Sequence, residues 1–344
     1  MSIDLKMTVS GCIRVLVAVT AIASLPFVLA TANIRLGTEI LILLNLAMLW
    51  NLLAGYAGLV SVGQQAFVGL GAYATWMALV WFGFPFWIAV AAGALAAGLA
   101  ASAFAPFLFR LQGATFAIGT WVMAEISLLV IANTSAVGGG AGVSVPARIA
   151  REIAPDRAGR ESAIFWTALM VALVVLLSSY LLMRSRWGLA LTAMRDEPTA
   201  SEAVGINTRQ VAVSIFLAVA VLTGAVGGLI LLAKLRITPD SAFSLFDWTA
   251  YTIFIVVIGG IGRLEGPIIG TAVFFTLRVL LADFGPVYLI ILGVLGIAVM
   301  LFAPKGIWGA VQTRTAFSAL PVNWPFRSIA IQPNLKIPAE ETKQ

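Results

Sequence analysis

Long apolar runs alternate along the chain with short polar segments. A helix needs about twenty predominantly apolar residues to cross the hydrocarbon core of a bilayer. Counting on this scale predicts an all-α polytopic membrane protein with about ten transmembrane helices. The predicted spans are residues 15–32, 39–53, a third ending at 82, 85–108, 115–133, 164–183, 211–233, 248–261, 268–282 and 288–302.

Polar and small residues interrupt this pattern within and after the second span. Asn45 and Asn51 fall inside the span, and a series of glycines follows it together with Ser61, Gln64 and Gln65. Amides and glycines at membrane depth are poorly suited to face lipid. The cluster predicts an interrupted or re-entrant segment that lines a cavity, and its polar side chains are candidates for the translocation path. Close helix packing is the alternative for any single glycine.

A second glycine cluster, residues 259–267, follows the eighth span and hints at an internal duplication, which transporters often have. The fifth span contains an acid, Glu125. A carboxylate within a span is costly and is a functional candidate by default. We expect it to face the bundle interior or the pore and to hydrogen-bond neighbouring helices. The alternatives are a proton carrier and a position close enough to the outer surface to be wet.

Residues 184–209 form a polar stretch between the sixth and seventh spans. Pro198 cannot continue a helix and pushes Glu197 toward an extended conformation. Thr199 and Glu202 have the spacing of a capping box, and Gly205 is a natural helix stop. The pattern predicts a helix, a kink, a short capped helix and a stop. An ordinary solvated connection is the alternative.

Composition narrows the function classes further. The 344 residues are 61% hydrophobic and only 10% charged, which all but excludes a water-soluble globule. The chain has no histidine and a single cysteine, Cys12. It therefore lacks the usual zinc and haem ligands and an internal disulfide, and we expect no metal, no cofactor and no catalytic residue. The net charge of +6 needs no nucleic-acid partner, because basic residues at cytoplasmic span ends account for it.

Lysine and arginine also predict the orientation. With both termini inside, the cytoplasmic segments carry more of these residues than the outer ones. The predicted organisation is a cytoplasmic N-terminus (1–14), a membrane domain (15–308) with a periplasmic loop (134–163) and a cytoplasmic loop (184–209), and an irregular cytoplasmic tail (309–344). Residues 30–32 also match a signal-peptidase site. We favour an uncleaved first span over a cleaved leader, because the rest of the chain inserts on its own hydrophobicity.

Five motifs in order resemble one family, the inner-membrane permeases of branched-chain amino-acid ABC transporters, and specifically the larger of their two permease types. The motifs are 55–73 (GYAGLVSVGQQAFVGLGAY), 111–120 (LQGATFAIGT) followed by Glu125, 187–207 (WGLALTAMRDEPTASEAVGIN), 259–267 (GGIGRLEGP) and 302–306 (FAPKG). Each motif alone is weak, and their shared order over residues 44–309 is specific.

The resemblance implies a multi-pass inner-membrane subunit that pairs with a second, homologous permease subunit. It also implies two cytoplasmic ATP-binding subunits and a periplasmic substrate-binding protein. The polar stretch would then dock on an ATPase and couple it to the pore. Its candidate coupling residues are Gly188, Arg195, Asp196, Glu197, Glu202, Gly205 and Asn207.

Departures from the family pattern leave the substrate open. Gln112-Gly113 stands where members often have Arg-Gly, and Gly139 and Gly140 stand where an Asn or Asp is common. The family also covers importers of urea and short amides, so a permease for those solutes is an alternative.

Other function classes make different demands on the residues. The chain has no phosphate-cradling Gly-x-x-x-x-Gly-Lys-Ser/Thr motif, so any ATPase is a separate chain. An ion-coupled secondary transporter is an alternative, with Glu125 carrying protons and Arg278 as its partner. A membrane-embedded enzyme is disfavoured by the absence of histidine and of paired carboxylates within a span.

Overall fold

The computed structural model describes residues 19–281, 287–303 and 306–315. The predicted cytoplasmic N-terminus, the start of the first span and most of the C-terminal tail lie outside these residues. Within them the fold is almost entirely helical, which confirms the predicted class. The membrane-embedded elements begin with a helix at Val19–Val28. The remaining elements are α2 (Thr31–Asn51), η1 (Leu52–Tyr56), α3 (Gln64–Val80), α4 (Phe86–Leu108), α5 (Ala114–Ala132), η2 (Ser135–Val137), η3 (Gly139–Ala141), β1 (Val143–Ser144), α6 (Ala147–Ile153), α7 (Arg157–Met183), α8 (Arg186–Asp196), α9 (Pro198–Ala203), α10 (Thr208–Lys234), β2 (Arg236–Ile237), α11 (Pro239–Ala242), η4 (Phe246–Ala250), α12 (Tyr251–Gly259), α13 (Gly266–Leu280), α14 (Val287–Phe302) and α15 (Gly306–Thr315).

Seven helical segments in the described residues are long and apolar enough to cross a membrane. They are α2 with η1, α4, α5, α7, α10, the continuous stretch from α11 to α12, and the segment that includes α14. The other three predicted spans correspond to shorter helices: Val19–Val28, α3 and α13. Two of these, α3 and α13, each follow a break in the helical backbone, which shortens them.

Two helices extend beyond the element boundaries that the sequence predicted. α7 begins at Arg157, inside the predicted periplasmic loop 134–163, because the Asp156 side chain caps its N-terminus by accepting a hydrogen bond from the Gly159 amide at 2.9 Å. α15 occupies the start of the tail that was predicted to be irregular. It packs against α12 and α13, where Arg263 donates a hydrogen bond to Gln312. A local N-cap therefore extends α7, whereas tertiary packing orders the start of the tail.

The core is built around α10, which packs against α3 and α4. Glycines allow these helices to approach until their backbones touch. A Cβ at Gly71 would lie 2.2 Å from the Gly224 carbonyl oxygen, and one at Gly227 would lie 2.1 Å from that of Val68. Small residues at helix crossings are the usual means of close packing in membranes. A second pair, α2 and α7, lies along the other side of α10.

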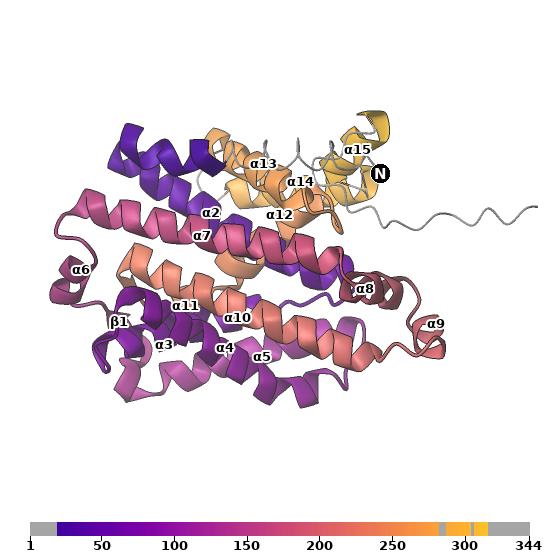
Figure 1. Cartoon of the computed structure of the whole chain (residues 1–344), viewed down its shortest axis with the longest axis horizontal. Coiled ribbons are helices and arrows are strands. Elements are labelled where there is room, and N and C mark those ends of the chain that lie inside the picture. Colours follow the sequence, from indigo (N-terminus) through magenta and orange to yellow (C-terminus); the bar gives the residue numbers. More distant parts are fainter. Residues whose placement is uncertain (1–18, 282–286, 304–305, 316–344) are drawn as a thin grey trace, which may run out of the picture.

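The two polar ends of the bundle lie far apart (Figure 1). α8 and α9 precede the first residue of α10, whereas β2 follows its last residue and pairs with β1 in an antiparallel ladder. α10 has 27 residues, which is a length of about 40 Å at 1.5 Å per residue. The polar stretch 184–209 and the loop that contains β1 and α6 are thus at opposite ends of the molecule.

Candidate functional site

The first break in the bundle lies between α2 and α3. α2 continues as the π-helical η1, and the backbone then leaves helical geometry over residues 57–63. Trp50 Nε1 donates to the Ser61 carbonyl at 2.8 Å, and the Val62 amide donates to Thr120 Oγ1 on α5 at 3.0 Å. Irregular backbone at membrane depth is tolerated only where protein or water satisfies its polar groups. The predicted interruption after the second span is confirmed.

The second break, residues 260–265, lies between α12 and α13 and packs directly against the first. The Asn51 side chain joins them. Its Nδ2 donates to the Arg263 carbonyl at 2.8 Å, and its Oδ1 accepts from the Gly262 amide at 2.8 Å. A Cβ at Gly55 would lie 2.5 Å from the Gly262 amide nitrogen, so the two backbones are in contact. The two glycine clusters that the sequence showed separately meet in one junction.

Arg195, at the end of α8, reaches this junction from the surface. Its Nη1 donates to the Gly55 carbonyl at 2.7 Å, and its guanidinium pairs with Asp196 Oδ1 at 2.8 Å. Gly58 has a φ of +71°, and a Cβ there would lie 3.1 Å from Arg195 Cγ. Because arginine stays protonated, the hydrogen bond to Gly55 is charge-assisted. We call residues 184–207 the α8–α9 segment; it is bonded to Gly55 in η1, next to the first break and in contact with the second.

The predicted order of helix, kink, short helix and stop in this segment is confirmed, but the predicted capping box is wrong. The N-cap of α9 is Glu197, because Pro198 occupies the first helical position, and no side chain caps the helix. Thr199 Oγ1 instead donates to Glu197 Oε1 at 2.7 Å. Glu202 accepts a hydrogen bond from Thr208 Oγ1 at 2.6 Å, which ties α9 to the start of α10.

Three other residues of the α8–α9 segment have clear structural roles. Gly205 has a φ of +90°, as expected for a helix stop. Asn207 caps α10, since its Oδ1 accepts from the Gln210 amide at 3.0 Å. A Cβ at Gly188 would lie 2.6 Å from Met183 Cα, so α8 folds back tightly on the end of α7. The segment is therefore rigidly connected to both long helices that flank it.

The candidate path residues other than Glu125 are all buried and lie along α2, the first break and the start of α3: Asn45, Asn51, Ser61, Gln64 and Gln65. Gln64 Nε2 donates to the Leu46 carbonyl at 3.0 Å, and Gln65 Oε1 accepts from the Thr249 hydroxyl of η4. Within the described residues, Asn45 Oδ1, Gln64 Oε1 and Gln65 Nε2 have no hydrogen-bond partner. Buried polar atoms are usually paired, so these side chains retain hydrogen-bonding capacity.

Glu125 neither faces the interior of this chain's bundle nor bonds a neighbouring helix in the described residues, so those two parts of the prediction were wrong; that it faces the pore stays a prediction. Its side chain is exposed on the outer face of α5, where Oε1 accepts a hydrogen bond from Trp121 Nε1 of the same helix at 3.1 Å. The proposed partner was also wrong, because Arg278 pairs with Glu39 at 3.2 Å. α5 is apolar on nearly every side, so its sequence carried no signal for which face packs inward.

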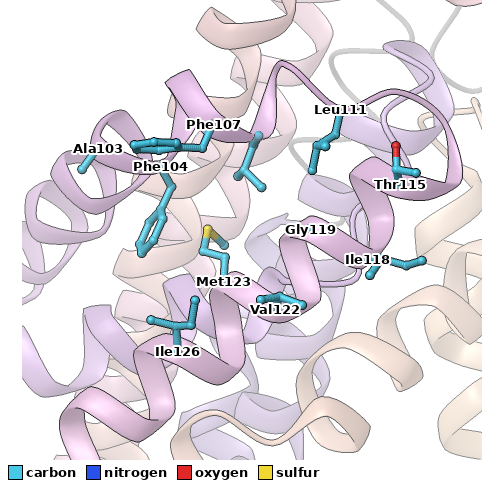
Figure 2. A pocket seen from close by; sticks show the side chains of 11 residues that line it. Ala103, Phe104, Phe107, Leu111, Thr115, Ile118, Gly119, Val122, Met123 and Ile126 are labelled. Atoms are coloured by element: carbon cyan, nitrogen blue, oxygen red, sulfur yellow. The ribbon is translucent and has the colours of Figure 1, made fainter.

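An apolar cavity of about 560 Å³ opens between α4 and α5. Figure 2 shows side chains of the two helices facing each other across it, including Phe104, Phe107, Val122 and Met123. Thr115 supplies the one hydroxyl among its lining side chains. A cavity with so few polar groups offers nothing to hold a charged solute in place.

A second cavity, of about 450 Å³, is strongly charged and was not predicted. It lies at the end of the bundle opposite the α8–α9 segment, between α2, α10, the η4–α12 stretch and α13. Its charged lining residues are Arg35, Glu39, Lys234, Asp247 and Arg278. From the sequence, Arg278 was considered only as a partner for Glu125, and the other four were not singled out as site residues. The described residues contain no group of three or more His, Cys, Asp or Glu side chains able to hold a metal ion.

The sequence that builds these sites matches a known protein family. Residues 32–304 match the family model described as branched-chain amino acid transport system / permease component. The matched range includes both helix breaks, the α8–α9 segment and the charged cavity.

Individual relatives agree with the family match. The chain is 27% identical over 304 residues to the high-affinity branched-chain amino acid transport system permease protein LivM of Escherichia coli strain K12, covering 82% of this chain and 71% of the relative. The LivM of Salmonella typhimurium strain LT2 is 26% identical over the same shares. A probable branched-chain amino acid transport permease protein LivM of Methanocaldococcus jannaschii is 26% identical over 53% of this chain and 56% of the relative. No solved structure matches the chain.

Proposed function

Because the chain belongs to the permease-component family of branched-chain amino acid transport systems, we propose that it is a membrane-spanning subunit of an ATP-driven ABC importer. Its solutes are branched-chain or related small amino acids, delivered by a periplasmic binding protein. The supporting structural observation is the bond between Arg195 on the α8–α9 segment and the Gly55 carbonyl at the junction of the two helix breaks. A surface segment is thereby connected to the part of the bundle least constrained by regular helix.

The proposal assigns the chain three kinds of partner. Of the two ATP-binding subunits, one contacts the α8–α9 segment on the cytoplasmic side. A second permease subunit completes the pore, and the binding protein docks at the opposite end. Both termini are then cytoplasmic. The distance between the ends of α10, about 40 Å, suits this arrangement because it spans the hydrocarbon core of a bilayer with its interfaces.

Coupling follows from the contacts of the segment. A shift of an ATP-binding subunit moves α8 and α9 as a unit, because Gly188 packs on α7 and Asn207 caps α10. The hydrogen bond from Arg195 transmits this movement to Gly55, and the hydrogen bonds of Asn51 transmit it to the second break. Elements that pivot at short irregular segments are a common basis of switching between two states. The breaks then change the relative positions of α3 and α13.

Co-purification and reconstitution test the proposal. The tagged protein, extracted gently, should bring two ATP-binding subunits and a second permease with it. In proteoliposomes this complex should take up leucine only with ATP and the binding protein present. Uptake that persists without ATP and follows an ion gradient would refute the proposal. Competition by urea or short amides, but not by leucine, would retain the importer and reassign its solute.

A further inference from the structure

The charged cavity combines charge of both signs with an apolar floor. Ile42, Ile230, Trp248 and Tyr251 form apolar or aromatic parts of its wall, and its charged residues line the same cavity. Its volume of about 450 Å³ is within the range of sites for small molecules. Unlike the apolar cavity between α4 and α5, it can offer polar and apolar contacts to one solute at the same time.

Pairing divides the five charges into two groups. Arg278 is paired with Glu39 at 3.2 Å, and Arg35 is paired with Glu161 at 2.6 Å. In the part of the chain that the structure describes, Lys234 and Asp247 belong to no ion pair. One cation and one anion therefore remain available to a ligand.

The surroundings of Lys234 and Asp247 determine how each side chain is presented to a ligand. Lys234 is the last residue of α10, and its Nζ lies 4.9 Å from the centroid of the Trp248 ring. Asp247 directly precedes Trp248 in η4 and is partly exposed. An ammonium ion over an aromatic face keeps its ability to donate hydrogen bonds to an approaching carboxylate.

We propose that this cavity binds an α-amino acid zwitterion, with Lys234 receiving the carboxylate, Asp247 the ammonium group, and the apolar wall an aliphatic side chain. The proposal rests on the proposed function and adds a binding station at the end of the bundle opposite the α8–α9 segment. It also separates amino acids from urea and neutral amides, which would leave both charges without partners.

The test measures solute binding to the complete transporter in nanodiscs, without ATP or binding protein. Saturation-transfer NMR titrations with leucine, leucinamide and 4-methylpentanoate report dissociation constants for the zwitterion and for analogues that lack one charge. We expect leucine to bind at least about tenfold more tightly than either analogue. Lys234→Gln should remove the preference for leucine over leucinamide. Asp247→Asn should remove the preference for leucine over 4-methylpentanoate.

Matched controls come from the same end of the molecule. Arg148 and Glu152 form an exposed ion pair on α6, outside the cavity. Arg148→Gln and Glu152→Gln remove the same charges and should leave all three dissociation constants unchanged. A nonspecific loss of fold would instead weaken every ligand equally and would also abolish ATP hydrolysis by the complex.

The outcomes separate this inference from the proposed function. If the wild-type complex takes up leucine with ATP, but both cavity variants keep the wild-type ligand preferences, the cavity assignment is overturned and the importer stands. If the variants instead lose affinity for the binding protein while leucine binding is unchanged, the charges serve docking, and the zwitterion site is likewise rejected. If the wild-type complex takes up no amino acid, the proposed function itself fails.

Discussion

The Arg195 guanidinium donates a hydrogen bond to the Gly55 carbonyl at 2.7 Å, across 140 positions of the sequence. The two residues come from different kinds of structure: Arg195 ends a surface helix, and Gly55 lies in the π-helical turn that closes the first long span. Arginine suits this contact because its long side chain carries five donors, so it can bond the Gly55 carbonyl and Asp196 at the same time. Removing this contact is therefore the most direct test of coupling between the α8–α9 segment and the helix breaks.

Replacing Arg195 with Leu should uncouple ATP hydrolysis from uptake. The substitution removes the charged hydrogen bond to Gly55, and a bond of this type contributes about 1.5–3 kcal/mol. This energy corresponds to a change of about tenfold or more in the equilibrium between the coupled and uncoupled states. The measurement is ATP hydrolysis and leucine uptake by the reconstituted complex. Arg184→Leu is the matched control, since Arg184 is exposed and, among the described residues, its side chain bonds Tyr180 alone. Equal uptake per ATP in the Arg195 and Arg184 variants would remove the contact from the mechanism.

Asn51→Ala should destabilise the junction of the two breaks. It removes both bonds to the second break and leaves the partly buried Gly262 amide without its acceptor, at a cost of about 2 kcal/mol. We expect a clear drop in the temperature at which the detergent-solubilised complex loses its monodisperse peak on size exclusion. Asn133→Ala serves as the control, because Asn133 is exposed and bonds Leu129 of its own helix. A matching loss in both variants would argue against a special role for the junction.

Gly205→Val should strain the turn after α9 without creating a clash. The φ of Gly205 is +90°, and a Cβ there would meet nothing within 4 Å, so the cost of about 1–2 kcal/mol comes from the backbone alone. The variant should insert normally but show reduced ATP-driven uptake at unchanged solute affinity of the binding protein. Val204→Ala, at an exposed neighbour, controls for surface changes. Wild-type coupling in Gly205→Val would mean that the segment is only a connection between spans.

Glu125→Gln should leave the pH dependence of uptake unchanged. Glutamine keeps an acceptor for the Trp121 indole but loses the charge. Since the Glu125 side chain lies on the outer face of α5 and not beside Arg278, the geometry offers no route for a carried proton between them. Uptake is measured between pH 5.5 and about 8, with Glu152→Gln as control. Complete loss of transport by a normally assembled variant would revive the ion-coupled alternative.

Cysteine labelling tests the orientation of the bundle. Ser144 in β1 and Glu202 in α9 are both exposed and lie at opposite ends of α10. In a Cys12→Ser background, an impermeant maleimide added to intact spheroplasts should label Ser144→Cys and spare Glu202→Cys. Permeabilised cells should label both, which controls for reactivity. Labelling of both positions in intact spheroplasts contradicts the orientation.

The sequence by itself determined the elements whose causes are local. Apolar runs located the long helices, because the length needed to cross hydrocarbon is set by the rise of a helix. Pro198 ended α8 and Gly205 ended α9 through restrictions on their own backbones. The first glycine cluster indicated the break after the second span, whereas the second cluster suggested only an internal duplication.

Capping and orientation of side chains needed more than local pattern. Thr199 and Glu202 have the spacing of a capping box, but Pro198 at the first helical position moved the cap to Glu197. The uniform hydrophobicity of α5 concealed which face packs inward, so the exposure of Glu125 was decided only by how α5 meets α3 and α4.

Tertiary structure alone decided which distant residues meet. Asn51 and Gly262 are 211 positions apart, and the charged cavity draws its residues from α2, α10, η4 and α13. Such contacts depend on the relative placement of whole helices, which in a membrane is set by close packing at positions such as Gly71 and Gly224. The hydrophobic periodicity of a single helix does not predict how that helix is placed relative to the others. The junction of the two breaks and the charged cavity therefore became visible only when the helices were assembled.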